Sequence, residues 1–220
     1  MGPLKDIKIF DLTRVLAGPH CTQILGDLGA DIIKVERVEN GDDTRKFAPP
    51  FMKDENGNDT DQSAYFSGTN RNKRSITLNL NSPEGQDIAK QLIAKSDILV
   101  ENFKVGTLEK YGLDYDTLKN EFPSLIYCSI TGFGQTGPYS KRPAYDALVQ
   151  AMGGVMSLTG DAKGEPMKVG VSIADLMAGM YGTVSILAAL RHRDKTNEGQ
   201  HLDISMLDAH VAWLANQGMN

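Results

Sequence analysis

The stretch IKIFDLTRVLAGPHCTQILGDLGADIIKVE, residues 7–36, predicts the fold class of this chain. Residues 7–12 form a short apolar run, which is typical of a buried strand. Residues 18–28 carry apolar side chains at helical spacing, and Gly29 stands where a glycine commonly ends a helix. Residues 31–36 have the pattern of a second strand. Strand, helix and strand in this order are the unit from which parallel sheets are built.

The same alternation continues along the chain. Strands are predicted at 75–80, 97–102 and 125–130, and helices at 83–95 and 106–121. Ser82 is a good helix N-cap, and Pro83 fits the first helical position. We therefore predict an α/β fold, a Rossmann-like parallel sheet with helices on both faces. Such sheets bind ligands beyond the carboxyl ends of their strands.

Outside this repeat the pattern changes. We predict helices within 145–160 and over 173–191, a strand within 196–206, and a further helix from 207 onwards. Residues 38–63 are polar, contain paired prolines and show little periodicity, so we expect a long loop there. Long loops in compact domains are often functional, although a surface insertion has the same composition.

Composition narrows the function classes. The formal net charge of −5 argues against general affinity for nucleic acid. No uninterrupted apolar run of about 18 residues and no leader segment is visible, so we expect a cytoplasmic chain without a membrane span. The cysteines and histidines lack the spacing of a disulfide framework or metal site, and only His20 lies near a strand-to-helix turn. These residues are Cys21, Cys128, His20, His192, His201 and His210.

Three glycines raise the question of a dinucleotide site. Gly132, Gly134 and Gly137 follow the strand at 125–130 with the spacing G-x-G-x-x-G. A dinucleotide site needs a helix that begins at the third glycine, because the helix N-terminus holds the pyrophosphate. The prolines at 138 and 143 prevent such a helix. We therefore expect a flexible, ligand-facing turn instead.

Asp175 is the only charged residue between Lys168 and Arg191. With Ser172 it forms the pattern of a capping box at the start of an apolar helix. A carboxylate in the first helical turn is also expected to stay ionised, and beside small residues it is a possible nucleophile. The residues alone favour the cap over a catalytic role, although the two roles are compatible. Ser172 itself fits a hydrolase nucleophile poorly, because GVSIA lacks the second glycine of the G-x-S-x-G elbow.

Basic residues gather before and after the predicted strands, where a ligand with several phosphates would use several of them. They are Arg37, Arg45, Arg71, Lys73 and Arg74. For each residue taken singly, a solvated charge or a surface ion pair is the better explanation. Phe103 and Lys104 follow a strand end and could hold an adenine and a phosphate, or could be a core phenylalanine beside a surface lysine.

Five stretches together carry a family resemblance. They are residues 11–37, NRNKRSITLNL (70–80), ENFKVG (101–106), residues 127–160, and VGVSIADLMAGMYG (169–182). In this order they resemble the class III coenzyme A transferases of the CaiB/BaiF type, most closely the branch that transfers CoA between succinate and glutarate or other dicarboxylates. The resemblance implies that residues 1–220 are the CoA-binding and catalytic large domain, without the small domain of the family.

The resemblance also implies the chemistry. Asp175 matches the family's nucleophile, which passes through an aspartyl-CoA thioester; the acyl-CoA is a substrate, and no permanent cofactor or metal is implied. The positions that match CoA or substrate contacts are Val15, Leu16, Ala17, Arg37, Leu78, Asn79, Asn81, Asn102, Phe103, Lys104, Lys110, Arg142 and Tyr145. Lys110 replaces an arginine of a relative, which makes a bidentate phosphate contact doubtful.

Two alternatives stay open. The related 2-methylacyl-CoA racemases place a histidine where this chain has Tyr145, and tyrosine is a poor base at neutral pH. Family members are also longer and form interlocked homodimers, so a catalytically inactive CoA-binding fragment is the other possibility. The expected partners are an acyl-CoA, a small carboxylic acid and a second copy of the chain, with no nucleic acid or membrane.

Overall fold

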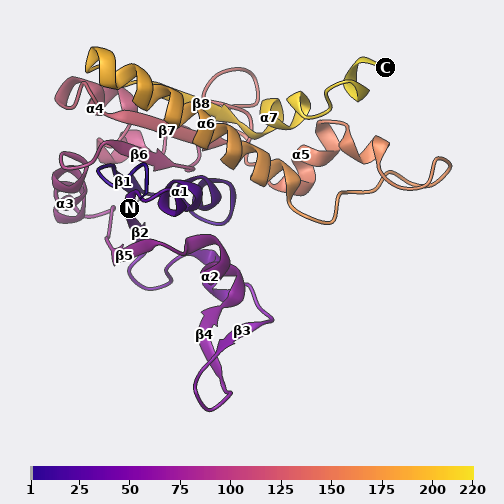
Figure 1. Cartoon of the computed structure of the whole chain (residues 1–220), viewed down its shortest axis with the longest axis horizontal. Helices are drawn as coiled ribbons and strands as arrows, with labels where there is room; N and C mark the ends of the chain where they lie inside the picture. The colour runs from indigo at the N-terminus through magenta and orange to yellow at the C-terminus, as the bar shows by residue number, and fades with distance from the viewer. Residues whose placement is uncertain (1) are drawn as a thin grey trace.

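Six parallel strands form the centre of the molecule in the computed structural model, which describes residues 2–220 (Figure 1). The strands are β1 Lys8–Asp11, β2 Asp31–Glu36, β5 Lys73–Thr77, β6 Ile98–Glu101, β7 Ile126–Thr131 and β8 His201–Ser205. Their order is β5-β2-β1-β6-β7-β8, and every neighbouring pair is parallel. The direction of winding reverses between β1 and β6, and such a switch point opens a crevice at the carboxyl ends of the strands.

Helices cover both faces of the sheet, as predicted. On one face lie α1 Ala17–Asp27, α5 Asp146–Met152, α6 Ile173–Thr196 and α7 Met206–Ala212, and on the other lie α3 Pro83–Ile93 and α4 Tyr115–Glu121. Strand β6 explains why both faces need cover. Ile98 and Val100 join the first core and Leu99 joins the second, because successive side chains of a strand point to opposite faces.

The central helix α6 packs directly on α1. A side chain at Gly179 would place its Cβ 2.8 Å from the carbonyl oxygen of Ala17, so only glycine allows this approach. By length and hydropathy α6 could also cross a membrane, a feature that the sequence reading did not predict. Half of its most apolar stretch is buried inside the protein, as in the core helix of a globular fold.

Several predicted boundaries are wrong. The loop predicted over 38–63 contains the 3-10 helix η1 Asp43–Lys46 and a hairpin of β3 Phe51–Lys53 with β4 Asp59–Ser63, which projects away from the sheet (Figure 1). The hairpin is followed by the unpredicted helix α2 Ala64–Asn70.

Two predicted helices are each divided in the structure. The helix predicted over 106–121 is divided into η2 Leu108–Tyr111 and α4, because Gly112 is left-handed at φ 62°. The helix predicted within 145–160 is divided into α5 and η3 Val155–Leu158, and η4 Gln217–Met219 follows α7.

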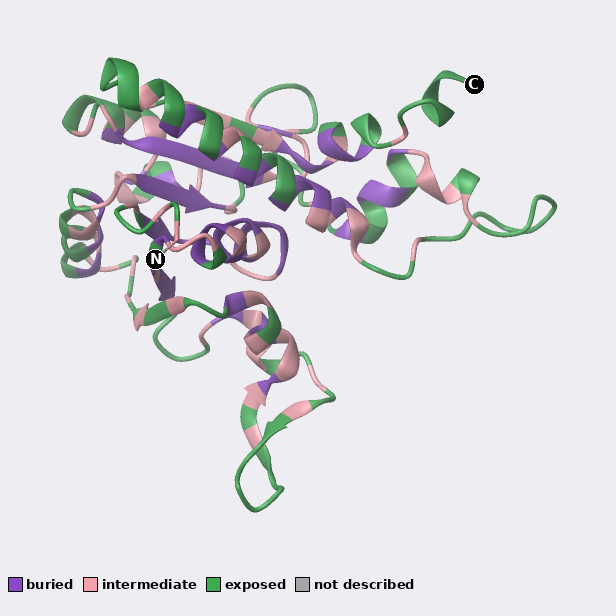
Figure 2. Ribbon diagram, in the orientation of Figure 1, coloured by how far each residue is buried: buried purple, intermediate pink, exposed green. Residues whose placement is uncertain are grey.

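Local capping signals were read more reliably. Ser82 accepts a hydrogen bond from the amide of Gly85 at 3.1 Å, and Gly29 is left-handed just after α1. Figure 2 shows buried residues concentrated in the sheet and α1, whereas the β3–β4 hairpin is mostly exposed. The core of the fold is therefore the sheet with its covering helices, and a ligand site is expected at the carboxyl ends of the strands.

Candidate active site

A cavity of about 260 Å³ opens at the carboxyl ends of β1, β6 and β7. It brings Asp175 together with eight of the other predicted residues, which come from three separate parts of the chain. These are Val15, Leu16, Ala17, Asn102, Phe103, Lys104, Arg142 and Tyr145. The location is the switch point of the sheet, where this class of fold binds its ligands.

A second cavity of about 550 Å³ lies beside the first. It gathers the predicted residues Arg37, Leu78, Asn79 and Asn81. Arg14 and Phe103 line both cavities, and the Arg14 guanidinium lies 5.3 Å from the centre of the Phe103 ring. Lys110 lines neither cavity, although its neighbour Tyr111 lines the second. The predicted contacts therefore fall into two adjoining spaces joined at one arginine and one aromatic ring.

The N-terminus of α6 is capped differently from the prediction. Ser172 is the N-cap residue but makes no capping hydrogen bond, so the capping box with Asp175 does not form. Asp146 takes over this role, because its carboxylate accepts a hydrogen bond from the amide of Ala174 at 2.9 Å. The Asp175 carboxyl is thereby left for the cavity.

The pKa of Asp175 is raised from 3.8 to about 7. Burial is the largest cause, the nearby charge of Asp146 adds to it, and a hydrogen bond from the backbone N–H of Ala17 opposes it. The expectation that the helix N-terminus keeps this carboxyl fully ionised is therefore wrong, since desolvation outweighs the helix end. Near neutral pH the group exists in both forms, and its ionised form is a poorly solvated nucleophile.

The turn between β1 and α1 forms one wall of the cavity and is held by side chains from elsewhere. Asn102 accepts a hydrogen bond from the amide of Arg14 at 2.9 Å and donates one to the carbonyl of the same residue at 2.7 Å. The oxygen and the nitrogen of the Asn102 amide thus both hold the wall of the cavity. A ligand that contacts Asn102, as predicted, would compete with these hydrogen bonds. Val15 has φ 70°, which for a β-branched residue stores about 1–3 kcal/mol of backbone strain.

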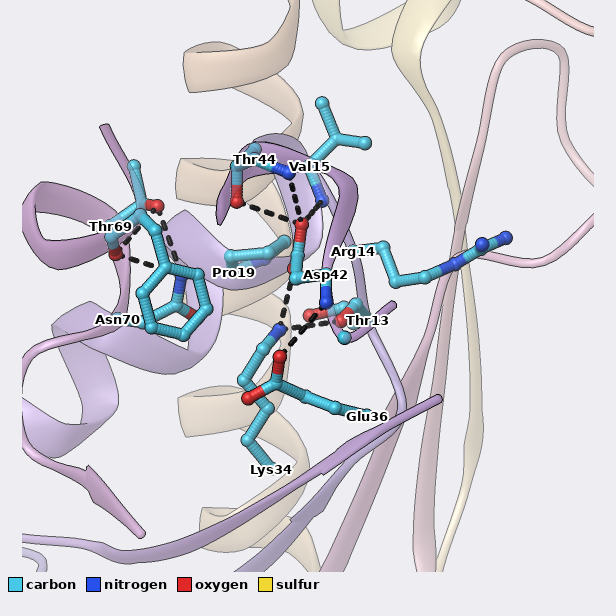
Figure 3. Close-up of polar contacts among 12 residues, drawn as sticks. Thr13, Arg14, Val15, Pro19, Lys34, Glu36, Asp42, Thr44, Thr69 and Asn70 are labelled. Atoms are coloured by element: carbon cyan, nitrogen blue, oxygen red, sulfur yellow. Dashed lines mark hydrogen bonds and ion pairs between the residues drawn. The ribbon is translucent and has the colours of Figure 1, made fainter. Parts of the chain in front are cut away.

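Beneath this turn lies a buried ion pair that sequence reasoning missed (Figure 3). The Lys34 ammonium contacts the Asp42 carboxylate at 2.8 Å, and both side chains are buried. Burial alone would raise the pKa of Asp42, but the charge of Lys34 and hydrogen bonds from Thr44 hold it below its ordinary value. Nothing in the sequence of the β2 strand distinguishes Lys34 from an exposed lysine.

Two further residues of the site were missed. Arg14, which lines both cavities, directly precedes the predicted Val15, so its place at a strand end was the available signal. Asp146, which caps α6 and raises the pKa of Asp175, directly follows Tyr145. Its position relative to α6 depends on the tertiary fold, so adjacency in sequence was its only signal.

Most of the basic residues considered for phosphate binding are paired within the protein. Arg71 pairs with Asp27, Lys73 with Asp11, Arg74 with Asp31, Arg45 with Glu36 and Arg37 with Asp43. Only Arg37 among them lines either of the two site cavities. The ion-pair interpretation therefore fits Arg45, Arg71, Lys73 and Arg74 better than the phosphate one.

The glycine-rich segment after β7 is an irregular loop, as predicted. No helix begins between the end of β7 at Thr131 and the start of α5 at Asp146, and Gly134 and Gly137 are left-handed at φ 79° and 87°. Gly132 lines the Asp175 cavity. Among the described residues, no histidine lines either site cavity, His20 included, and no group of three or more side chains could hold a metal ion.

Comparison with known proteins gives one consistent result. The model of CoA-transferase family III matches residues 4–220. The succinate–glutarate CoA-transferase of Agrobacterium fabrum is 51% identical over 99% of the chain, and the succinyl-CoA:glutarate CoA-transferase of Homo sapiens is 46% identical over 99%. The crystal structure of a CAIB/BAIF family protein from Brucella suis superposes with a TM-score of 0.94 at 51% identity, over all of this chain and 57% of that one. The chain spans 54% and 48% of the two sequence relatives, about half their length.

Proposed function

The chain belongs to CoA-transferase family III, and from this we propose that it moves CoA from an acyl-CoA donor to a carboxylic acid, with Asp175 as the nucleophile. The observation that carries the proposal is the Asp175 carboxyl itself. It is partly desolvated, has a pKa of about 7, and faces a cavity at the switch point of the sheet. A carboxylate in this state is nucleophilic enough to attack a thioester near neutral pH.

The proposed reaction has four steps, each of which exchanges one bond for another. The Asp175 carboxylate attacks the donor thioester and the C–S bond breaks, which gives an acyl–aspartyl anhydride and CoA thiolate. The thiolate attacks the aspartyl carbonyl, releases the donor acid and leaves aspartyl-CoA. The acceptor carboxylate then attacks aspartyl-CoA and displaces the thiolate, which gives a second acyl–aspartyl anhydride. Finally the thiolate attacks the acceptor acyl carbonyl, which forms the new CoA thioester and releases Asp175. No water enters, so the free energy of the thioester is kept.

The two adjoining cavities suit the two ends of a CoA thioester. We place the adenosine and its phosphates in the larger cavity with Arg37, Leu78 and Asn79, and the thioester beside Asp175 in the smaller one. Arg14 and Phe103 line the passage between them. A guanidinium at this point would hold the diphosphate, where the adenosine end of CoA joins the uncharged pantetheine arm, and the aromatic face would pack against that arm.

The acids exchanged are proposed to be small dicarboxylates. The named relatives act on succinate and glutarate, which carry a second carboxylate away from the thioester. Arg14 and Arg142 line the cavity that contains Asp175, and a guanidinium can bind such a carboxylate through two parallel hydrogen bonds. Succinyl-CoA and glutarate are therefore the pair to assay first.

The complete polypeptide is also proposed to act as a homodimer. The exposed side of α5 and α6 carries large apolar side chains that a single copy leaves in water, and such patches mark interaction surfaces. They are Leu148, Met152, Met180, Tyr181, Val184 and Leu187. Light scattering on the complete polypeptide is expected to give twice the mass of one chain, and a monomer at micromolar concentration would refute this part.

The chemistry is tested by trapping. The complete polypeptide is mixed with succinyl-CoA, treated with hydroxylamine, digested and sequenced by mass spectrometry. We expect a hydroxamate on Asp175, dependent on succinyl-CoA and absent from Asp175→Asn. A wild-type protein that exchanges CoA at full rate without any modified Asp175 would refute the aspartyl intermediate. Loss of configuration at the α carbon of a chiral 2-methylacyl-CoA, without CoA exchange, would instead identify a racemase.

A further inference from the structure

The turn that leads into α1 does not support its own conformation. Val15 occupies the left-handed region at φ 70°, where a β-branched side chain is rarely found. The N-cap residue of α1, Leu16, offers no side-chain hydrogen bond to the helix. A turn of this kind persists only where neighbouring groups fix it.

Asp42 and Lys34 fix it from below, at two points (Figure 3). The Asp42 carboxylate accepts a hydrogen bond from the amide of Val15 at 3.3 Å, and the Lys34 ammonium donates one to the carbonyl of Thr13 at 2.8 Å. The two side chains are joined by their own contact of 2.8 Å. One buried pair therefore holds the backbone on both sides of Arg14.

Asp42 is itself immobilised by its surroundings. One of its carboxylate oxygens accepts hydrogen bonds from the amide of Thr44 at 3.0 Å and from the Thr44 hydroxyl at 2.8 Å. The amide of Asp42 donates to Glu36 at 2.8 Å. Asp42 and Thr44 of the 38–63 segment therefore pack beside the β1–α1 turn, whereas the β3–β4 hairpin of the same segment projects away from the sheet (Figure 1).

The turn connects directly to the proposed nucleophile. Two residues after Val15, Ala17 lines the same cavity as Asp175 and its backbone N–H lowers the pKa of that carboxyl, and Gly179 keeps α6 against the same residue. Asp146 and Tyr65 are the other charged or titratable groups that act on Asp175. Tyr65 is also exposed to the charge of Asp42, but burial raises its pKa to about 12, so it carries no charge near neutral pH. A change in the turn would therefore reach Asp175 through Ala17.

We infer that Asp42, together with Lys34, is a positioning residue for CoA transfer: it sets the turn whose Ala17 amide meets the Asp175 carboxyl. The inference rests on the proposed function and adds to it a role for a residue outside the cavity. A buried ion pair contributes little net stability compared with apolar side chains of the same size, whereas fixing one conformation is a use that such pairs are known to have.

The test replaces both charges at once, so that no unpaired charge is left buried. The Lys34→Met/Asp42→Leu variant of the complete polypeptide is assayed for succinyl-CoA-dependent hydroxamate formation across pH. We expect the rate to fall on the order of 100-fold, the cost of a small misplacement of a reacting group. The pH at which the rate is half-maximal should move upward, because Ala17 no longer helps Asp175 to ionise.

Rescue separates positioning from simple destabilisation. Glycine enters the left-handed region without strain, so adding Val15→Gly should let the turn form again without Asp42. We expect it to recover the rate of the double variant several-fold, although in the wild type it removes a cavity contact and lowers the rate. If Val15→Gly lowers both rates by the same factor, the turn is not what Asp42 controls and the inference is wrong.

The matched control is the ion pair of Arg193 with Asp97, at the other end of α6 and joined at 2.9 Å. Arg193→Met/Asp97→Leu also removes the hydrogen bond from the amide of Lys8 to Asp97, so it should lower the melting temperature without moving the pH dependence. If the Lys34→Met/Asp42→Leu variant does not fold, Lys34→Met/Asp42→Asn keeps acceptors for Thr44 and should give a smaller shift in the same direction.

The outcomes are distinguishable from failure of the proposed function. A wild type that is never modified at Asp175 refutes the aspartyl mechanism itself. A wild type that is modified, with folded charge-free variants whose rate and pH dependence are unchanged, refutes only the role of Asp42.

Discussion

Two connections at the same edge of the sheet line the Asp175 cavity, and they are built in opposite ways. The turn between β1 and α1 is short, and residues 13–15 have backbone groups held by Asp11, Lys34, Asn102 and Asp42. The connection between β7 and α5, residues 132–145, is long, contains three glycines, and is largely exposed over 136–143. Its links to the rest of the fold include one from the amide of Gln135 to Asp203 at 2.9 Å.

The difference separates two requirements of the proposed reaction. The donor hydrogen bond to Asp175 must be in place before the substrate arrives, because preorganised groups need no rearrangement at the moment of reaction. The acyl groups change during the reaction, so the opposite wall must accept more than one shape. We interpret the first turn as the fixed wall and the glycine-rich connection as the adaptable wall.

The largest expected effect is at the proposed nucleophile, Asp175, which lines the cavity from the first turn of α6. Asp175→Asn keeps the size of the side chain and removes the nucleophile, so CoA exchange should fall at least about 10³-fold, as for other lost nucleophiles. The assay is exchange of CoA between succinyl-CoA and labelled glutarate. Circular dichroism and CoA binding should stay near wild type, and retention of more than a tenth of the activity would exclude this assignment.

The second-largest effect is expected from a change that removes hydrogen bonds from the fixed wall. Asn102→Ala removes both hydrogen bonds to Arg14, which should cost about 2 kcal/mol of unfolding free energy, since two backbone groups lose their partners. Exchange should fall by about tenfold or more. The matched change in the adaptable wall is Gln135→Ala, which removes no backbone hydrogen bond and should change exchange less than about threefold. Equal losses from the two variants would contradict the distinction between the walls.

The next prediction concerns how the unfolding free energy changes with pH. The pKa of Asp175 is raised from 3.8 to about 7 in the folded protein, so folding favours its protonated form. Its contribution to the unfolding free energy is therefore complete below pH 3.8 and is lost as the pH rises towards 7. Chemical denaturation of wild type and Asp175→Asn should show the wild type losing stability relative to the variant over this range. A constant difference would mean that the carboxyl is not desolvated.

The smallest expected effect concerns the adaptable wall alone. Gly137 is left-handed at φ 87°, and nothing lies within 4 Å of where a side chain would begin. Gly137→Ala should therefore cost only about 1–2 kcal/mol of backbone strain. Because the residue does not line the cavity, exchange should change less than about threefold. A loss above tenfold would show that this wall is also fixed in one conformation.

Much of the fold was readable from local patterns. The alternation of apolar strands and helices predicted the parallel sheet, and the glycine and serine signals at Gly29 and Ser82 marked the correct helix ends. The prolines after Gly137 predicted the absence of a dinucleotide helix. The boundaries that failed, such as the division of 106–121 at Gly112, depend on packing that a single segment does not reveal.

For the candidate site, the sequence identified many of the residues but not how they are arranged. Family resemblance, not spacing, pointed to Asp175, and local reasoning favoured a capping box that does not form. Asp146 caps α6 instead, from 28 residues away in sequence. The pairing of Lys34 with Asp42 was equally hidden, because a lysine in a strand has the same sequence pattern whether its ammonium is buried or exposed.

The sequence by itself therefore determined the order and kind of the elements, the class of sheet, and the residues available at its carboxyl edge. The reason is that strand and helix periods, caps and chain breaks are properties of neighbouring residues. Only the tertiary structure decided which carboxyl is desolvated, which lysine is buried, and which turn is held under strain. Those properties depend on dielectric surroundings and charges brought together from distant segments, and no local pattern records them.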